Sequence, residues 1–128
     1  MTPEAKHFLV KARGLLRQAD IVLGVRLPDA AGRTAYLAGF HAAQAFIFER
    51  TGKVAKTHKG VHAEFARLAQ REPAIDSAIR AFLGRTYNLK AIADYETDPG
   101  ANVTEAQARE ALEASRLFVD RLAHMLGE

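Results

Sequence analysis

The pattern of apolar and polar positions predicts α-helices along almost the whole chain. Apolar side chains recur at helical spacing from residue 3 to about residue 24, and charged side chains fill the opposite side. The same spacing predicts helices over 58–70, from beyond Pro73 to about Tyr95, and from Thr104 onward. Residues 97–102 have the composition of a loop. No stretch shows the strict alternation of a β-strand. We therefore expect an all-α protein, a five-helix up-and-down bundle with short connections that forms one domain over residues 1–128.

A central helix around residues 33–50 is apolar on nearly every side. Between Ala35 and Phe48, His41 and Gln44 are the strongly polar residues. A helix that is apolar all round is a buried helix, so it needs neighbours on all its faces, or a second subunit. Its expected core stripe comprises Tyr36, Phe40, Ala43 and Ile47. The two polar side chains must find hydrogen-bond partners there, which makes the His41 face a candidate site.

Residues with known capping preferences mark most of the predicted helix ends. Thr2, Thr57 and Thr104 are expected N-caps, the last in a capping box with Gln107. Asp29 is an expected cap for the central helix. Gly52 is an expected left-handed stop at its end.

Composition narrows the range of functions. The chain has 128 residues, no cysteine and a formal charge of +3. It therefore has no thiolate chemistry, and its modest basicity permits contact with phosphate without requiring it. It shows no signal-peptide run, no membrane-length apolar segment and no Gly-rich phosphate loop. We expect a cytoplasmic protein with no bound cofactor or metal and no membrane partner.

Three motifs, in order, resemble the HEPN family of small helical bundles, in particular its short stand-alone prokaryotic branch. The stretch Arg33-Thr34-Ala35-Tyr36-Leu37-Ala38-Gly39-Phe40-His41-Ala42-Ala43 is similar to that branch's arginine–tyrosine–alanine–aromatic–histidine helix. Thr57-His58-Lys59-Gly60-Val61 resembles its next helix start, and Ala93-Asp94-Tyr95 the end of its fourth helix. Together the motifs cover most of the chain from Arg33 onward.

The resemblance implies a homodimer with links to nucleotides and RNA. Some relatives accompany minimal nucleotidyltransferases as what is taken to be their substrate-binding subunit, and others are ribonucleases or toxins of toxin–antitoxin pairs. The catalytic relatives carry an arginine followed four to six residues later by a histidine. Here seven residues lie between the members of three such pairs, Arg33 and His41, Arg50 and His58, and Arg116 and His124, and no arginine is followed by a histidine at the required spacing. Lys90 also stands where the branch tends to have arginine. These departures argue against ribonuclease activity.

Six residues are candidates for binding a ligand or its phosphate: Arg33, His41, His58, Lys90, Asp94 and Tyr95. His41 is either a ligand contact in a groove shared with Arg33 or a core histidine satisfied by the protein. His58 lies in the first helical turn, where backbone N–H groups attract anions, close to Lys53, Lys56 and Lys59. Asp94 and Lys90, four residues apart, form a helical ion pair, and a partly buried Asp94 would seek Arg33, His41 or His58. His58 and His62 have the spacing of two metal ligands, but Lys59 stands where the zinc-peptidase motif has glutamate, and Asp94 is the only attractive third ligand, which argues against a metal.

The sequence favours a non-catalytic module that contacts nucleotide or RNA. It would be the partner of a minimal nucleotidyltransferase or a component of a toxin–antitoxin pair, with Tyr36 or Tyr95 packing against a base. The first alternative is a metal-independent ribonuclease with an atypical arrangement of Arg33 and His41, or of His58. The second is a purely structural dimerisation module.

Overall fold

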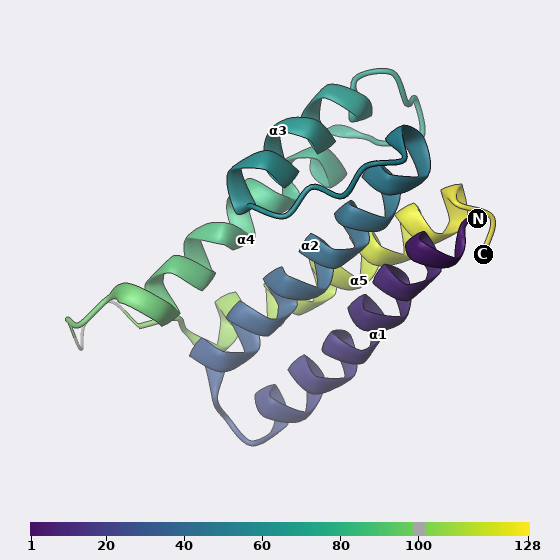
Figure 1. Ribbon diagram of the computed structural model, residues 1–128. Coiled ribbons are helices and arrows are strands. Elements are labelled where there is room, and N and C mark those ends of the chain that lie inside the picture. Colours follow the sequence, from purple (N-terminus) through teal and green to yellow (C-terminus); the bar gives the residue numbers. More distant parts are fainter. Residues whose placement is uncertain (99–101) are drawn as a thin grey trace.

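Five α-helices follow one another in the computed structural model, which describes residues 1–98 and 102–128. They are α1 (Pro3–Gly24), α2 (Pro28–Thr51), α3 (His58–Ala69), α4 (Ser77–Tyr95) and α5 (Glu105–Met125) (Figure 1). Neither described range contains a strand. The predicted all-α, five-helix bundle is therefore confirmed, and part of the loop predicted over 97–102, residues 99–101, lies outside the described residues.

The predicted caps are present at four of the helix ends. The hydroxyls of Thr2, Thr57 and Thr104 each accept a hydrogen bond from the first turn of the following helix, and Gln107 completes the capping box. Gly52 ends α2 with φ 72°, a left-handed conformation that glycine adopts without a steric penalty. These local predictions succeeded because each rests on one side chain and its own backbone.

The prediction that Asp29 caps α2 was wrong. The helix begins at Pro28, two residues before the start that an Asp29 cap would give, and its N-cap, Leu27, makes no side-chain hydrogen bond. The Asp29 carboxylate instead accepts a hydrogen bond of 2.9 Å from the backbone N–H of Val103, which precedes α5. Proline at the first helical position has no N–H to satisfy, so this start needs less capping.

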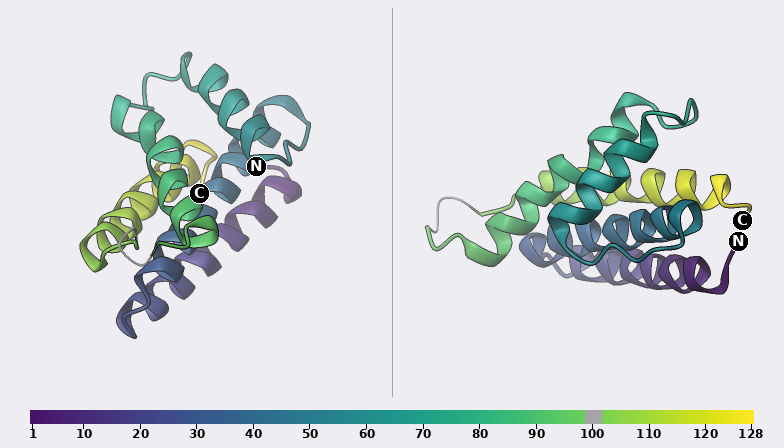
Figure 2. Two further views of the ribbon diagram at one scale, coloured as in Figure 1. Left: turned by 90° about the vertical axis from the view of Figure 1, so that its left-hand side faces the viewer. Right: turned by 45° about the horizontal axis from the view of Figure 1, so that its top comes forward.

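Helix α2 is the central element of the bundle. Thirteen of its 24 residues are buried, and it contacts α1, α3, α4 and α5. In both views of Figure 2, α1, α2 and α5 run alongside one another, whereas α3 and α4 form a pair that crosses them. The alanines of α2 permit these close approaches, as its apolar pattern predicts.

The crossing of α2 and α4 is closest at Gly39. A Cβ atom at this position would lie 2.1 Å from a ring carbon of Phe82. The Phe82 ring stacks on Phe118 of α5, with 4.6 Å between the centroids. Glycine at position 39 therefore sets how near α4 lies to α2, and with it the position of the residues that α4 carries.

The described part of the chain contains no helix long and apolar enough to cross a bilayer.

Candidate functional site

An open cleft lies where the first turns of α2 meet the last turns of α4. It has a volume of about 600 Å³ and is lined by Asp29, Ala30, Arg33, Ala93, Asp94 and Tyr95. Figure 1 shows these two helix ends at the same end of the molecule. Three of the six predicted site residues, Arg33, Asp94 and Tyr95, therefore line one cleft, although Arg33 is about 60 positions from the other two in the sequence.

Asp94 joins the cations of this region. Its carboxylate lies 2.8 Å from the Lys90 ammonium and 3.8 Å from Nε of Arg33. The Lys90 side chain is almost completely buried, and its bond to Asp94 raises the pKa of the ammonium group. The Arg33 side chain is 47 % exposed, and the longer contact is its one ion pair among the described residues. Lys90 is thus a fixed structural cation, while Arg33 is able to turn toward a ligand.

Aromatic rings surround the Lys90 ammonium. It lies 5.1 Å from the centroid of Tyr95 and 5.9 Å from that of Tyr87, distances at which a cation is attracted to an aromatic face. The Tyr95 residue is 71 % exposed. Its ring is therefore held at the cleft while remaining open to a ligand.

Next to the cleft, one tyrosine hydroxyl joins two histidines of α3. The Tyr36 hydroxyl lies 2.9 Å from Nδ1 of His58 and 2.8 Å from Nε2 of His62. Tyr36 is completely buried, and burial raises the pKa of its hydroxyl far above the ordinary value. The Tyr87 ring covers all three side chains, with centroids 5.4 Å from each. The tyrosine at position 36 therefore fixes α3 against α2.

Both histidines of this group favour the neutral form. Burial lowers the pKa of His58, and the positive charge of Lys90 lowers it further, while Asp94 acts in the opposite direction. Burial also lowers the pKa of His62, with a smaller effect from His58. His58 is therefore electrostatically connected to the Lys90–Asp94 pair. Near pH 7 the two rings act as hydrogen-bonding groups without charge.

His41 lies elsewhere. Its Nδ1 is 2.7 Å from the side-chain oxygen of Gln44, and the Gln44 amide donates a 2.7 Å hydrogen bond to the carbonyl of Ala55. Burial is the main cause that lowers the pKa of His41, and Lys11 of α1 adds to the effect. The shared groove expected for His41 and Arg33 does not form: His41 does not line the cleft that contains Arg33. His41 and Gln44 instead hold the connector, residues 52–57, which leads from α2 to α3.

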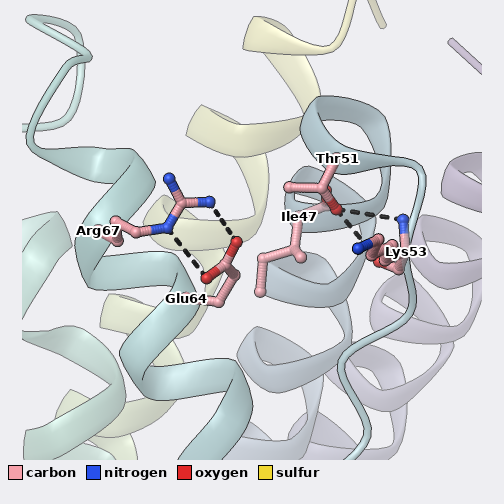
Figure 3. Close-up of polar contacts among 5 residues, drawn as sticks. All are labelled: Ile47, Thr51, Lys53, Glu64 and Arg67. Atoms are coloured by element: carbon pink, nitrogen blue, oxygen red, sulfur yellow. Dashed lines mark hydrogen bonds and ion pairs between the residues drawn. The ribbon is translucent and has the colours of Figure 1, made fainter.

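The connector and α3 enclose a second, smaller groove. Its volume is about 310 Å³, and Figure 3 shows Ile47 between the Thr51–Lys53 turn and the Glu64–Arg67 ion pair. The Thr51 hydroxyl accepts a 3.1 Å hydrogen bond from the backbone N–H of Lys53. The three lysines of the predicted basic stretch, Lys53, Lys56 and Lys59, are exposed. Their exposure does not test whether the start of α3 binds phosphate, and this expectation stays a prediction.

Sequence reasoning missed three features of the site. It placed Tyr36 in the core stripe, which is confirmed, but it also offered the ring for packing against a base, for which a completely buried side chain is not available. It offered Lys90 as a candidate for binding a ligand or its phosphate and overlooked that the spacing of Ile79, Leu83 and Thr86 places position 90 on the buried face of α4. It also overlooked Tyr87, which no motif marks.

The histidine pair is not arranged as a metal site in this structure. The nitrogens of His58 and His62 that converge do so on the Tyr36 hydroxyl. Among the residues for which positions are given, no group of three or more histidine, cysteine, aspartate or glutamate side chains could hold a metal ion. The spacing of the two histidines is explained by their shared hydrogen-bond partner, Tyr36.

Known proteins resemble the chain in both sequence and structure. The chain is 34% identical over 113 residues to a protein named "Putative toxin MJ0605" from Methanocaldococcus jannaschii, a match that covers 88% of this chain and 81% of that protein. The crystal structure of TT1696 from Thermus thermophilus superposes with a TM-score of 0.78, covering 96% of this chain and 98% of that one, at 22% identity. The second likeness establishes the fold alone.

The family model agrees with these likenesses. The model of the HEPN domain matches residues 5–125, which include all the described site residues. The protein belongs to the HEPN domain family.

Proposed function

We propose that this protein is a non-catalytic HEPN module that contacts RNA and works as one component of a toxin–antitoxin pair. The pairing is suggested by the name of the relative from Methanocaldococcus jannaschii. The RNA contact rests on one observation, the convergence of Arg33, Asp94 and Tyr95 on a single open cleft. A nucleotidyltransferase partner is the other pairing that the family suggests.

The cleft contains the groups that single-stranded RNA needs. A half-exposed guanidinium binds a phosphate through two parallel hydrogen bonds, and Arg33 is suited to this because its contact with Asp94 is long. An exposed ring stacks on an unpaired base, a role available to Tyr95. The volume of about 600 Å³ leaves room for one nucleotide.

Binding without cleavage is supported by the position of the histidines. No arginine is followed by a histidine with four to six residues between the two. His41, the histidine nearest to Arg33 along α2, is bonded to Gln44 and lies away from the cleft. His41 and Arg33 therefore do not form a joint site for RNA cleavage.

The decisive variant is Arg33→Ala. Fluorescence anisotropy with a labelled single-stranded RNA, in EDTA and at fixed salt, is expected to show affinity reduced about ten- to a hundredfold, because a charge-assisted contact contributes roughly 1.5–3 kcal/mol. Arg80→Ala is the matched control, since it removes the same charge from an exposed position about 20 Å from the cleft along α4. Equal affinities of the two variants would refute the cleft as the RNA site.

The toxin–antitoxin role has its own test. Induced expression of the chain in a host cell is expected to slow growth, and co-expression of the adjacent reading frame to restore it. Arg33→Ala is expected to weaken the growth defect while the protein level stays unchanged. Growth unaffected by the wild-type chain would contradict the role without bearing on RNA binding.

A ribonuclease remains the second candidate because two neutral imidazoles lie beside the cleft. An imidazole that is neutral at pH 7 is able to act as general base on a 2′-hydroxyl, and the second ring could serve as the acid. If this is the activity, RNA cleavage survives EDTA, His58→Ala and His62→Ala abolish it, and His41→Ala retains it. Intact RNA after prolonged incubation with the wild-type protein would exclude this candidate.

A further inference from the structure

The charges of the cleft do not suit a site for phosphate alone. The charged lining residues are one guanidinium, that of Arg33, and two carboxylates, those of Asp29 and Asp94. Lys90 neutralises one carboxylate from behind but is almost completely buried. The cleft therefore offers one exposed cation beside two acceptors. A polyanion with no donor groups would be repelled by the two carboxylates of this lining.

Both carboxylates are held in place by the protein. One oxygen of Asp29 accepts the backbone N–H of Val103 at 2.9 Å, which fixes the carboxylate at the mouth of the cleft. Asp94 is fixed through Lys90 at 2.8 Å, and its side chain is 23 % exposed. An ionised carboxylate only accepts hydrogen bonds, and its two oxygens together offer about four positions for donors. Each therefore retains acceptor capacity beyond the contact that fixes it.

We infer that the cleft selects RNA with an unpaired guanine, whose Watson–Crick edge donates to a cleft carboxylate while Tyr95 stacks on the base and Arg33 binds a phosphate. The inference rests on the proposed function and names the part of the RNA that is recognised. It follows from the combination of fixed acceptors, an exposed ring and one half-exposed cation in a single cleft.

Guanine is the base whose edge matches an acceptor pair. Its N1–H and N2 amino group are adjacent donors, and a carboxylate accepts both in one plane. On the same edge, adenine and cytosine each place a ring-nitrogen acceptor beside the amino donor, and uracil places its one donor between two carbonyls. These acceptors would face a carboxylate oxygen, and such a mismatch is a strong means of rejecting the wrong base.

The test uses short oligouridine RNAs in which one central nucleotide is guanosine, adenosine, cytidine or uridine. Anisotropy with the wild-type chain is expected to show about tenfold tighter binding of the guanosine RNA, the discrimination typical of a good bidentate contact. Asp29→Asn and Asp94→Asn tell which carboxylate reads the base, because the amide retains one acceptor and loses the second. One of them is expected to bring the four affinities close together, whereas Glu113→Gln, at an exposed position on α5, preserves the preference.

The outcomes separate this inference from the proposed function. RNA binding that depends on Arg33 but is equal for the four bases would overturn guanine selection and leave the RNA contact standing. Binding that ignores Arg33 would overturn both. A guanosine preference that neither aspartate variant alters would show that another part of the protein reads the base, and would also overturn the inference.

Discussion

At the scale of single residues, Tyr36 makes the most consequential contact of the structure. Its hydroxyl is the shared partner of two histidines, and it joins α2 to α3 from a completely buried position. Removing one partner of a buried hydrogen bond costs more than the bond contributes, because the remaining group keeps its desolvation penalty.

Tyr36→Phe is therefore expected to lower the free energy of unfolding by about 1–3 kcal/mol, measured by urea denaturation. Tyr87→Phe is the matched control: it removes a hydroxyl from the ring that covers the same histidines, and its hydroxyl makes no hydrogen bond in the described structure. We expect its stability to stay within about 0.5 kcal/mol of the wild type. A Tyr36 variant as stable as the control would mean that water replaces the hydroxyl.

The sequence predicted single residues well where a local rule governs them. The threonine caps, Gly52 and the Lys90–Asp94 pair each depend on neighbours within four positions, so spacing alone located them. The Tyr36 contacts and the Asp29–Val103 bond join residues more than 20 positions apart. Such contacts depend on how the helices pack, and no spacing rule in one sequence contains that information.

At the scale of helices, the packing of α4 on α2 positions the cleft. The approach is limited by Gly39, where a Cβ atom would collide with the Phe82 ring. The ring cannot move aside easily, since Phe82 is buried and stacked on Phe118. Small displacements of α4 at this crossing would be carried to Asp94 and Tyr95, three to four turns further along the helix.

Gly39→Ala is expected to destabilise the protein by about 1–3 kcal/mol through overpacking, and to weaken RNA binding as well. Gly84→Ala makes the same change on an exposed position of α4, where a Cβ atom meets nothing within 4 Å. It is expected to stabilise the helix by about 0.5–1 kcal/mol, as alanine does in place of helical glycine. Thermal melting of both variants tests this comparison. Stabilisation by both substitutions would show that a Cβ atom fits at the crossing of α2 and α4.

The order and approximate ends of the helices were predictable because each amphipathic stripe is a property of a contiguous segment. The crossing of the α3–α4 pair over α1, α2 and α5 could not be predicted from the sequence. It depends on which stripe packs against which, and the uniformly apolar surface of α2 accepts neighbours from every direction.

At the scale of the whole molecule, the histidines link stability to pH. The pKa values of His41, His58 and His62 are all lowered in the folded protein, with burial as the largest cause. Each therefore contributes stability that is fully present above the unfolded pKa of about 6.5 and is lost as the pH falls through the folded value.

Urea midpoints are accordingly expected to fall steadily as the pH is lowered from about 7.5 to about 5. The double variant His58→Gln and His62→Gln should show a shallower decrease, because two of the three groups no longer titrate. The groups facing this pair, Lys90 and Asp94, remain in both proteins. A wild-type midpoint that does not change over this range would contradict the burial of the rings.

The shared hydroxyl of Tyr36 has a further consequence, because a hydroxyl has a single proton to give. While both rings are neutral, Tyr36 donates to one ring and accepts from the other. Since the hydroxyl meets Nδ1 of His58 and Nε2 of His62, the two rings must then share one tautomer, with hydrogen on both Nε2 atoms or on both Nδ1 atoms. Reversing the hydroxyl proton, with exchange at the outer nitrogens, converts one form into the other. The His58–Tyr36–His62 group thus has two tautomeric forms that interconvert without moving a heavy atom. Nitrogen-15 spectra of the two imidazoles would show which form is populated.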